Sequence, residues 1–504
     1  MMKLAKLLQD IQNYEVVKGS PDKNIQNVHF DSRKVNENDL FIAIKGVDED
    51  GHAFIKNALE DGATGFVLED EQFMPDNKGI TVIKVKNSRK ALAHIAASYY
   101  DYPARKLTVI GVTGTDGKTT TSTLIHHILQ HANLKAGLIT SINAIIGEHI
   151  YETGFHTTTP DAISIQKYLN EMVSAGCEYA VIETSSHGLA QYRVEACEYD
   201  VAVLTNITSE HLDYHKSQEE YIKAKARLFT MLAQSYKKEN ISKISILNKD
   251  DANYEEFIQF LADRHLSYGL KSSADFRAEN IENKQGKLSF VVHSPKGEFK
   301  IESPLLGNYN VHNILAACAV AYSQHIPTNA YAEAITTLDH IKGRMELIPY
   351  EKGAFKVIID FAHTAYALEQ ALKTTRTFTP NKIHVVFGSA GLRDIKKRKQ
   401  MGIVASKFAD KIYITAEDPR TEDVNAIIDE IAQGCLEQER DEGKDFFRIP
   451  DRKQAIETAI MNADDGDTVL CCGKAHETTM CYGRNEQPWS EYEVVQKALM
   501  KRMD

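Results

Sequence analysis

Short apolar runs, each followed by polar residues, recur along this chain and predict β-strands. In the middle of the sequence, the run 107–112 has the character of a buried parallel strand. Apolar residues at helical spacing follow it, at Leu124, Ile125, Ile128 and Leu129. Further strand-like runs occupy 179–182 and 201–204. Because strands alternate with helices, this region is predicted to form a parallel α/β sheet.

The pattern continues on both sides of this middle region. After Gly343, strand-like runs occupy 356–359, 384–387, 412–415 and 468–471. Before Pro103, short apolar runs such as 40–44 and 65–68 alternate with polar turns, and the proline is expected to stop a helix. A chain of 504 residues exceeds one compact core, since domains usually hold about 100–200 residues. We predict an α/β protein of three domains, at 1–103, 104–342 and 343–504.

Composition narrows the class of protein. Hydrophobic residues make up 43% and charged residues 26%, as in a folded globular chain. The net charge of −11 and the lack of a dense Lys/Arg stripe argue against a nucleic-acid partner. No apolar run has the length of a membrane span, and the first ten residues do not form a signal peptide. Seven cysteines without zinc-site spacing indicate reduced thiols and a cytoplasmic enzyme, which we expect to be a monomer.

The segment 111–120 carries the strongest chemical signal. It reads Gly-Val-Thr-Gly-Thr-Asp-Gly-Lys-Thr-Thr and lies between a predicted strand and a predicted helix. Glycines let backbone N–H groups approach phosphate oxygens, so this segment predicts a nucleotide-binding loop. Lys118 is expected to neutralise the outer phosphates, and Thr119 is expected to hold Mg²⁺. Val112 departs from the general pattern, which has glycine there.

Polar residues after two further strands are candidates for a metal site. Glu183 follows the run 179–182, and carboxylate oxygens suit Mg²⁺. After 201–204 come His211, Asp213 and His215, which are candidates for metal binding or proton transfer. The segment 221–229 is predicted to be a helix with solvated basic residues, Lys225 among them. The basic cluster 396–399 is either a solvated helix face or a local anion site.

These motifs, in this order, resemble those of the Mur ligases, and within that family the branch that adds the third residue of the peptide. The resemblance rests on 111–120, 183–187, 205–215 and Ala224-Lys225. It extends to further segments along nearly the whole chain: 31–35, 46–51, 158–161, 307–313, 343–346 and 360–364.

The resemblance implies an N-terminal domain that binds the uridine nucleotide, a central P-loop ATPase domain, and a Rossmann-like C-terminal domain for the incoming amino acid. It implies ATP and Mg²⁺ as cofactors, with UDP-N-acetylmuramoyl-dipeptide and a diamino acid as partners. It places catalysis on Lys118, Lys225 and His211. ATP contacts are expected at Gly114, Thr115, Asp116, Gly117, Lys118, Thr119, Thr120, Asn313 and Arg344.

The resemblance also assigns the metal and substrate residues. The metal ligands are expected to be Thr119, Glu183, His211 and Lys225, the last as a carbamate formed with CO₂. Forming that carbamate needs a neutral amine, which implies a lowered lysine pKa. The UDP-linked substrate is expected to meet Ser32, Thr158, Thr159, Ser185, Gln191 and Arg193. The incoming amino acid is expected to meet Arg393, Asp418, Arg420, Gly473 and Glu477.

Two segments of the third domain bear on which amino acid is added. Residues 417–420 read Glu-Asp-Pro-Arg, whereas ligases for meso-diaminopimelate resemble Asp-Asn-Pro-Arg here. Arg420 suits the extra carboxylate of diaminopimelate, which favours that substrate over L-lysine. In the segment 473–477, Ala475 replaces the family's glycine and is strained if the backbone there needs a positive φ.

Two other functions compete with this hypothesis. A folylpolyglutamate synthetase shares the ligase chemistry but lacks the UDP-binding block at 31–51. A catalytically idle P-loop protein needs none of Lys118, Glu183, His211 and Lys225, all of which are present.

Overall fold

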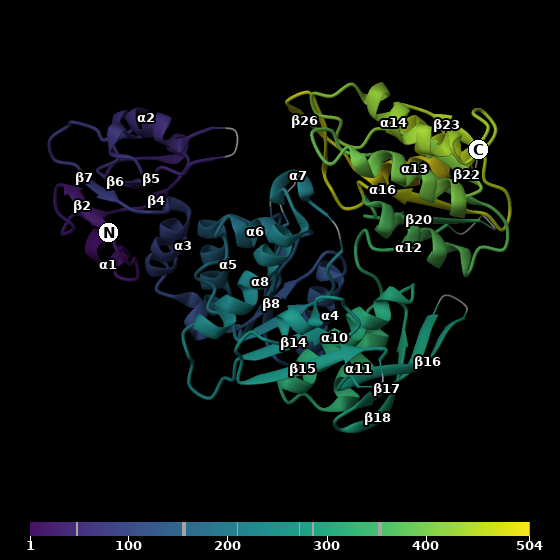
Figure 1. Cartoon of the computed structure of the whole chain (residues 1–504), viewed down its shortest axis with the longest axis horizontal. Coiled ribbons are helices and arrows are strands. Elements are labelled where there is room, and N and C mark those ends of the chain that lie inside the picture. The colour runs from purple at the N-terminus through teal and green to yellow at the C-terminus, as the bar shows by residue number, and fades with distance from the viewer. Residues whose placement is uncertain are drawn as a thin grey trace.

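The computed structural model describes residues 1–46, 49–153, 158–208, 210–271, 273–284, 287–350 and 355–502, apart from the side chains of Leu212, Asp213 and Lys284. Figure 1 shows three bodies that follow one another along the chain: the N-terminal body in purple, the middle body in teal and the C-terminal body in green to yellow. Each is built around its own sheet, as the alternation of strands and helices predicts.

The N-terminal body contains a sheet of order β2-β7-β6-β5-β4, with parallel pairing from β7 to β4. The predicted strand at 65–68 is confirmed, whereas the one at 40–44 ends at Ile42. Helix α3 ends at Tyr99, and Tyr102 takes a left-handed φ of 51° before Pro103. The elements are β1 (Met2–Lys3), α1 (Leu4–Leu7), β2 (Glu15–Lys18), β3 (Asn24–Ile25), β4 (Val28–His29), η1 (Ser32–Lys34), β5 (Leu40–Ile42), η2 (Gly51–Phe54), α2 (Ile55–Glu60), β6 (Gly65–Leu68), η3 (Glu71–Phe73), β7 (Thr81–Lys84), α3 (Ser88–Tyr99) and η4 (Pro103–Lys106).

The middle body is a long sheet of order β11-β10-β9-β12-β8-β13-β14-β15-β16-β17-β18, parallel from β9 to β16. Helices α4 and α10 bury one face, and α5 and α8 bury the other. The elements are β8 (Thr108–Thr113), α4 (Lys118–His131), β9 (Ala136–Ile139), β10 (Ala144–Ile146), β11 (His149–Tyr151), α5 (Ala162–Ser174), β12 (Tyr179–Glu183), α6 (Ser186–Ala190), β13 (Val201–Leu204), α7 (Leu212–His215), α8 (Gln218–Gln234), β14 (Ile244–Asn248), α9 (Tyr254–Phe257), β15 (Arg264–Gly269), β16 (Phe276–Lys284), β17 (Lys287–Ser294), β18 (Gly297–Ser303), α10 (Tyr309–Ser323) and α11 (Thr328–Thr337).

The C-terminal body is a sheet of order β19-β20-β24-β21-β22-β23, in which only the edge strand β19 pairs antiparallel among the described strands. Helices α12, α13 and α14 cover one face, and α15 and α16 cover the other. The elements are β19 (Glu346–Ile348), β20 (Lys356–Asp360), α12 (Ala365–Arg376), β21 (Ile383–Phe387), α13 (Lys396–Phe408), β22 (Lys411–Ile414), α14 (Val424–Leu436), β23 (Phe446–Arg448), α15 (Arg452–Met461), β24 (Thr468–Cys472), β25 (Thr479–Tyr482), β26 (Asn485–Pro488) and α16 (Glu491–Lys501).

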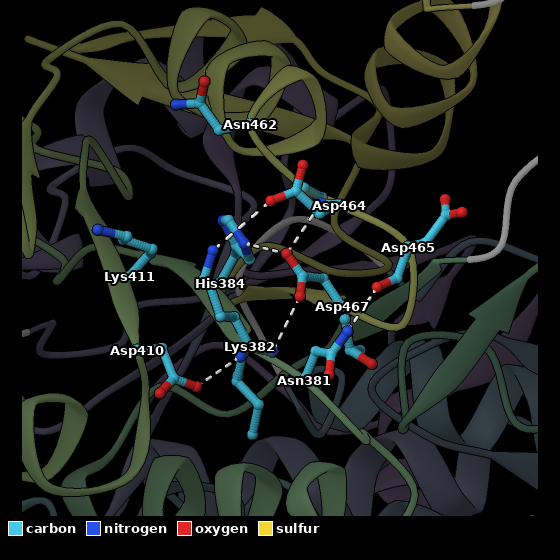
Figure 2. A network of polar contacts seen from close by, with 12 residues as sticks. Asn381, Lys382, His384, Asp410, Lys411, Asn462, Asp464, Asp465 and Asp467 are labelled. Atoms are coloured by element: carbon cyan, nitrogen blue, oxygen red, sulfur yellow. Dashed lines mark hydrogen bonds and ion pairs between the residues drawn. The ribbon is translucent and has the colours of Figure 1, made fainter.

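A polar network closes the amino-terminal edge of the C-terminal sheet (Figure 2). The carboxylate of Asp467 accepts hydrogen bonds from Lys382 N (2.8 Å), Asp464 N (2.8 Å) and His384 Nε2 (2.9 Å). His384 and Asp467 are each 1% exposed, and the His384 ring stacks on Tyr413. This network ties the starts of β21 and β24 together, at the end of the strands opposite to the predicted site.

Two expectations from composition can be checked. The seven cysteines are free thiols, six of them buried and Cys177 half-buried. Over the described residues, no helix is both long and apolar enough to cross a membrane.

Candidate active site

The predicted phosphate loop connects β8 to α4. Gly117 caps α4 with a left-handed φ of 80°, and a Cβ there would lie 2.2 Å from Asn313 Oδ1. A Cβ on Gly114 would lie 1.8 Å from Thr205 Oγ1. Val112 belongs to β8 and is fully buried, so the departure from the general pattern lies in the strand that precedes the loop. The loop therefore presents the amino-terminal turn of α4, a place where backbone N–H groups bind phosphate.

Three elements converge on the first turn of α4. Thr119 Oγ1 donates to Glu183 Oε1 at the end of β12 (3.1 Å), and Arg344 Nη2 donates to Thr119 Oγ1 (3.0 Å). Ser141 N donates to the other oxygen of Glu183 (2.9 Å). Lys118 Nζ donates to Thr115 O within the loop (2.6 Å). Arg344 belongs to the segment that leads into β19, so the C-terminal body touches the phosphate loop directly.

The predicted metal ligands are only partly gathered. Thr119 and Glu183 offer hard oxygen donors beside the phosphate loop, and such donors suit Mg²⁺. Among the described residues, no group of three or more His, Cys, Asp or Glu side chains is arranged to hold a metal ion. His211 instead packs edge-on against His187, with ring centroids 4.7 Å apart, and the side chain of Asp213 lies outside the described residues. A metal role of His211 and His215 stays a prediction.

Half-buried acids and imidazoles lie where the two bodies meet. His363 Nε2, from the loop after β20, lies 3.5 Å from Glu210 Oε1 in the middle body. Burial raises the pKa of Glu210, but His211 and His363 outweigh burial and leave that pKa lowered. Burial and the nearby Glu210 raise the pKa of Asp116 to about 6, and burial lowers the pKa of His211 to about 4. The loop thus faces charges from both bodies at short range.

The prediction that the basic residues of the helix at 221–229 are solvated is wrong for Lys225. It is 1% exposed, its Nζ donates to Gly114 O (2.6 Å), and it lies 4.3 Å from the centre of the Tyr221 ring. Burial and the nearby Lys118 lower its pKa well below the ordinary value. The sequence pattern missed this because α8 turns Lys225 toward the loop while the neighbouring Lys223 stays exposed. A neutral amine beside the phosphate loop is the condition that carbamate formation requires.

A cavity of about 490 Å³ lies between the N-terminal and middle bodies. Its lining includes Phe30, Arg89, Asp161, Gln191 and Arg193. Arg193 donates to Thr159 O (2.7 Å) and to Gln191 Oε1 (2.6 Å), and Thr159 Oγ1 lies 2.9 Å from Ser185 Oγ. Four of the six predicted contacts to the UDP-linked substrate are therefore connected to one another.

The other two predicted contacts and one unpredicted residue complete this picture. Ser32 opens η1 and Thr158 precedes Thr159, but neither belongs to the lining that the described residues give this cavity. Arg89 on α3 also faces it, and burial lowers the pKa of its guanidinium. Sequence reasoning missed Arg89, since a single arginine in a predicted helix carries no motif.

The predicted amino-acid site lies at the carboxyl ends of β22 and β24. Lys474 is fully buried and binds Asp418 through both oxygens (2.9 Å each) and Glu477 Oε2 (2.6 Å). Arg420 Nη1 donates to Gly391 O (3.0 Å), and Gly473 has a φ of 106°. Ala475 has a φ of 41°, so the expected strain is present. Sequence reasoning did not select Lys474, because a lysine in a loop is usually solvated.

The prediction for the basic cluster 396–399 is wrong for Arg398. In the cluster 396–399, Arg398 is 1% exposed and lies 2.9 Å from both Glu422 and Glu430, so it is neither a solvated face nor an open anion site. Lys397 Nζ donates to His363 O (2.8 Å).

Asn313 on α10 is near the loop, and its Oδ1 accepts from Thr121 Oγ1 (3.3 Å). Arg393 acts electrostatically on His187, which places it toward the middle body.

Comparisons with known proteins agree with this arrangement of a phosphate loop facing the strand ends of another domain. Residues 112–321 match the Mur ligase middle domain, 343–475 the glutamate ligase domain and 24–100 the catalytic domain of the Mur ligase family. These parts define an ATP-dependent ligase that forms amide bonds.

Individual relatives are similar over their whole length. A UDP-N-acetylmuramoyl-L-alanyl-D-glutamate–2,6-diaminopimelate ligase of Clostridioides difficile is 38% identical, over 99% of this chain and all of its own. A UDP-N-acetylmuramyl-tripeptide synthetase of Roseiflexus is 40% identical, over 94% of each chain. A solved structure of a UDP-N-acetylmuramoyl-L-alanyl-D-glutamate–2,6-diaminopimelate ligase has a TM-score of 0.68 at 29% identity, covering 100% of this chain and 99% of its own.

The chain therefore belongs to the Mur ligase family and, within it, to the tripeptide-synthetase type, whose members add the third residue to the peptide of a peptidoglycan precursor. This membership favours the ligase over a folylpolyglutamate synthetase or a catalytically idle nucleotide-binding protein.

Proposed function

We propose that the chain joins meso-2,6-diaminopimelate to the D-glutamate carboxylate of UDP-N-acetylmuramoyl-L-alanyl-D-glutamate, acting in the cytoplasm as a monomer and using ATP. The contact of Arg344 with Thr119 is the observation that carries the proposal, because it brings the carboxyl ends of the C-terminal sheet to the phosphate loop. The choice of amino acid is supported by Arg420 and by relatives that are 38% identical and are named as 2,6-diaminopimelate ligases.

The three proposed domains, 1–103, 104–342 and 343–504, divide the work. The first domain and the cavity beside it would take the UDP-linked dipeptide, with Arg89 and Arg193 as cations near Thr159, Ser185 and Gln191. The middle domain would hold ATP along Gly114–Thr120, with Asn313 behind the loop and Arg344 at its first helical turn. The third domain would hold the amino acid near Arg393, Asp418, Arg420, Gly473 and Glu477.

Charge decides the first chemical step. A substrate carboxylate that attacks the terminal phosphate of ATP brings two anions together, and Lys118 would offset their repulsion. Thr119, Glu183 and His211 are the proposed ligands of Mg²⁺, with a carbamate of Lys225 as a further one; Mg²⁺ there would withdraw charge from the phosphates. The first step yields an acyl phosphate and ADP.

The second step joins the amine to the activated acyl group. The neutral amine attacks the acyl carbon to give a tetrahedral intermediate, the nitrogen releases a proton, and phosphate leaves as the amide bond is made. Acyl phosphates hydrolyse, so water has to be kept out while the amine approaches. The contacts of Arg344 with Thr119 and of His363 with Glu210 join the third body to the middle body, and they support a closed arrangement that would keep water out.

The test is a phosphate-release assay with the full chain, ATP, Mg²⁺ and UDP-N-acetylmuramoyl-L-alanyl-D-glutamate. Amino acids are added one at a time: meso-diaminopimelate, L-lysine, L-ornithine and, as a control without a distal amine, 2-aminopimelate. The proposal expects phosphate release that depends on diaminopimelate and a product whose mass has increased by that residue. Preferential turnover of L-lysine would overturn the choice of amino acid. Phosphate release that does not depend on an added amino acid would overturn the ligase step.

A further inference from the structure

The phosphate loop itself contains an acid. Asp116 directly precedes Gly117, the residue that caps α4. The backbone of Asp116 is fixed by the loop after β13: its N donates to Asn206 Oδ1 (3.1 Å), and its O accepts from Thr205 Oγ1 (2.7 Å) and from Asn206 Nδ2 (3.0 Å). These contacts hold the base of the Asp116 side chain in place within the loop.

One oxygen of the Asp116 carboxylate is unpaired. Oδ2 is shielded from water and has no hydrogen-bond partner in the part of the chain that the structure describes. The lysines at the loop donate to its backbone instead. Lys118 Nζ donates to Thr115 O (2.6 Å), and Lys225 Nζ donates to Gly114 O (2.6 Å). A shielded carboxylate oxygen without a partner costs free energy, so stability does not account for an acid at this position.

Charged groups of both the middle and the C-terminal bodies surround Asp116. Burial and the nearby Glu210 raise the pKa of Asp116 to about 6, and that pKa is lowered by Lys118, His363 and Lys225. A carboxyl group with such a pKa is ionised at about pH 8. Asp116 therefore places a negative charge in the loop that would hold the phosphates of ATP.

We propose that Asp116 sets the nucleotide affinity of the loop: its negative charge repels the phosphates of ATP and ADP, so the chain binds both nucleotides less tightly than the loop would without that charge. Like charges in a partly shielded site repel each other more strongly than they do in water. The inference rests on the proposed function, because it needs the phosphates at this loop. The family resemblance predicts that Asp116 contacts ATP, and the inference gives its side chain an effect opposite to attraction.

The experiment measures dissociation constants by isothermal titration calorimetry, with the full chain, Mg²⁺ and a buffer at about pH 8. The ligands are ADP, AMP and AMPPCP, an ATP analogue that is not hydrolysed. Asp116→Asn removes the charge and keeps the shape, and Asp116→Ala removes the charge without adding an amide. Both variants are expected to bind ADP about tenfold more tightly, because the repulsion from one charge is lost. AMPPCP should gain at least as much as ADP, and AMP, which lacks the outer phosphates, should gain less.

Other roles of Asp116 predict different results. If its carboxylate attracts the nucleotide or Mg²⁺, both variants will bind ADP more weakly than the unmodified chain. If an amide at position 116 donates a new hydrogen bond to phosphate, Asp116→Asn will bind ADP more tightly and Asp116→Ala will not. Either result would overturn the inference, and so would an affinity for ADP that is unchanged in both variants.

Asp263→Asn is the matched control. Asp263 directly precedes β15, at the end of the middle sheet opposite to the loop, and its Oδ2 accepts from Lys243 N (2.8 Å). This variant removes the same charge from the same body and is expected to leave the affinity for ADP unchanged, since solvent and salt screen a distant charge. Equal tightening in Asp263→Asn would mean that net charge, and not the place of Asp116, controls binding.

Thermal melting gives a second readout. The Asp116 variants are expected to melt at or above the temperature of the unmodified chain, because a shielded charge without a partner has been removed. A structural role of Asp116 predicts a lower melting temperature together with weaker binding of ADP, which would contradict the inference. Failure of the proposed function would look different, because the unmodified chain would then show no binding of ADP.

Discussion

In the C-terminal sheet, the edge formed by the amino-terminal ends of the strands differs from the edge formed by their carboxyl ends in hydrogen bonding and in backbone strain. At the amino-terminal edge, the Asp467 carboxylate receives three hydrogen bonds within the network of Figure 2. At the carboxyl-terminal edge, Asp418, Arg420 and Ala475 have positive φ values. Among the described side chains at this edge, buried atoms of Ser389, Glu417 and His476 have no hydrogen-bond partner.

The contrast separates stability from function within one domain. A satisfied buried network stabilises the fold, whereas strained backbone and unpaired polar atoms cost free energy and persist where a substrate or a moving domain meets them. The strained edge is also the one that contacts the middle body, through Arg344 at Thr119 of the phosphate loop and through His363 at Glu210. Substitutions near the loop are therefore expected to change rate, and substitutions at the far edge to change stability.

The largest effect is expected for Lys118→Ala. Removal of the cation at the phosphate loop should lower kcat/KM for ATP by about a thousandfold or more, because the charge offset during phosphoryl transfer is lost. The melting curve should stay close to that of the unmodified chain. Phosphate release and differential scanning calorimetry measure the two quantities, and near-normal turnover would contradict the phosphate role.

Lys225→Ala is expected to come next. If the buried amine carries a carbamate, activity should fall by about a hundredfold, and added short-chain carboxylates should restore part of it by replacing the missing anion. Lys223→Ala, on the exposed side of α8, is the matched control and should have little effect. A Lys225→Ala variant with full activity would discard the carbamate.

Asp467→Ala tests the other edge. It leaves the buried His384 ring and two backbone N–H groups without their acceptor, which should destabilise the C-terminal body by about 2 kcal/mol or more. Hydrogen exchange of β21 and β24 should report the loss locally, whereas kcat/KM well below the melting temperature should stay within about twofold of normal. A large loss of activity without a loss of protection would break the comparison between the edges.

The smallest effect is expected for Ala475→Gly. Ala475 has a φ of 41° and is 1% exposed, so glycine should relieve backbone strain and stabilise the C-terminal body by about 1 kcal/mol. The resulting rise in melting temperature should be measurable by calorimetry. A lower melting temperature would mean that the lost methyl packing outweighs the strain.

Much of the fold was predictable because the signals are local. Apolar runs gave the strands at 65–68 and 201–204 to the residue, and the glycines at 114 and 117 marked the phosphate loop. Family motifs also brought together residues that the structure connects, such as Thr159, Ser185 and Arg193. The strand predicted at 40–44 ends at Ile42, two residues early, because the ends of a strand depend on pairing with its neighbours as well as on hydrophobicity.

The sequence by itself determined where several of the strands and helices form and where the glycine-rich loop lies, since periodicity and glycine spacing act between near neighbours. Tertiary structure alone decided that Lys225 is buried, that Arg398 is paired, and that Asp418 and Glu477 share Lys474. Burial and charge pairing depend on groups far apart in sequence, and these set the pKa of an amine or the charge that a substrate meets.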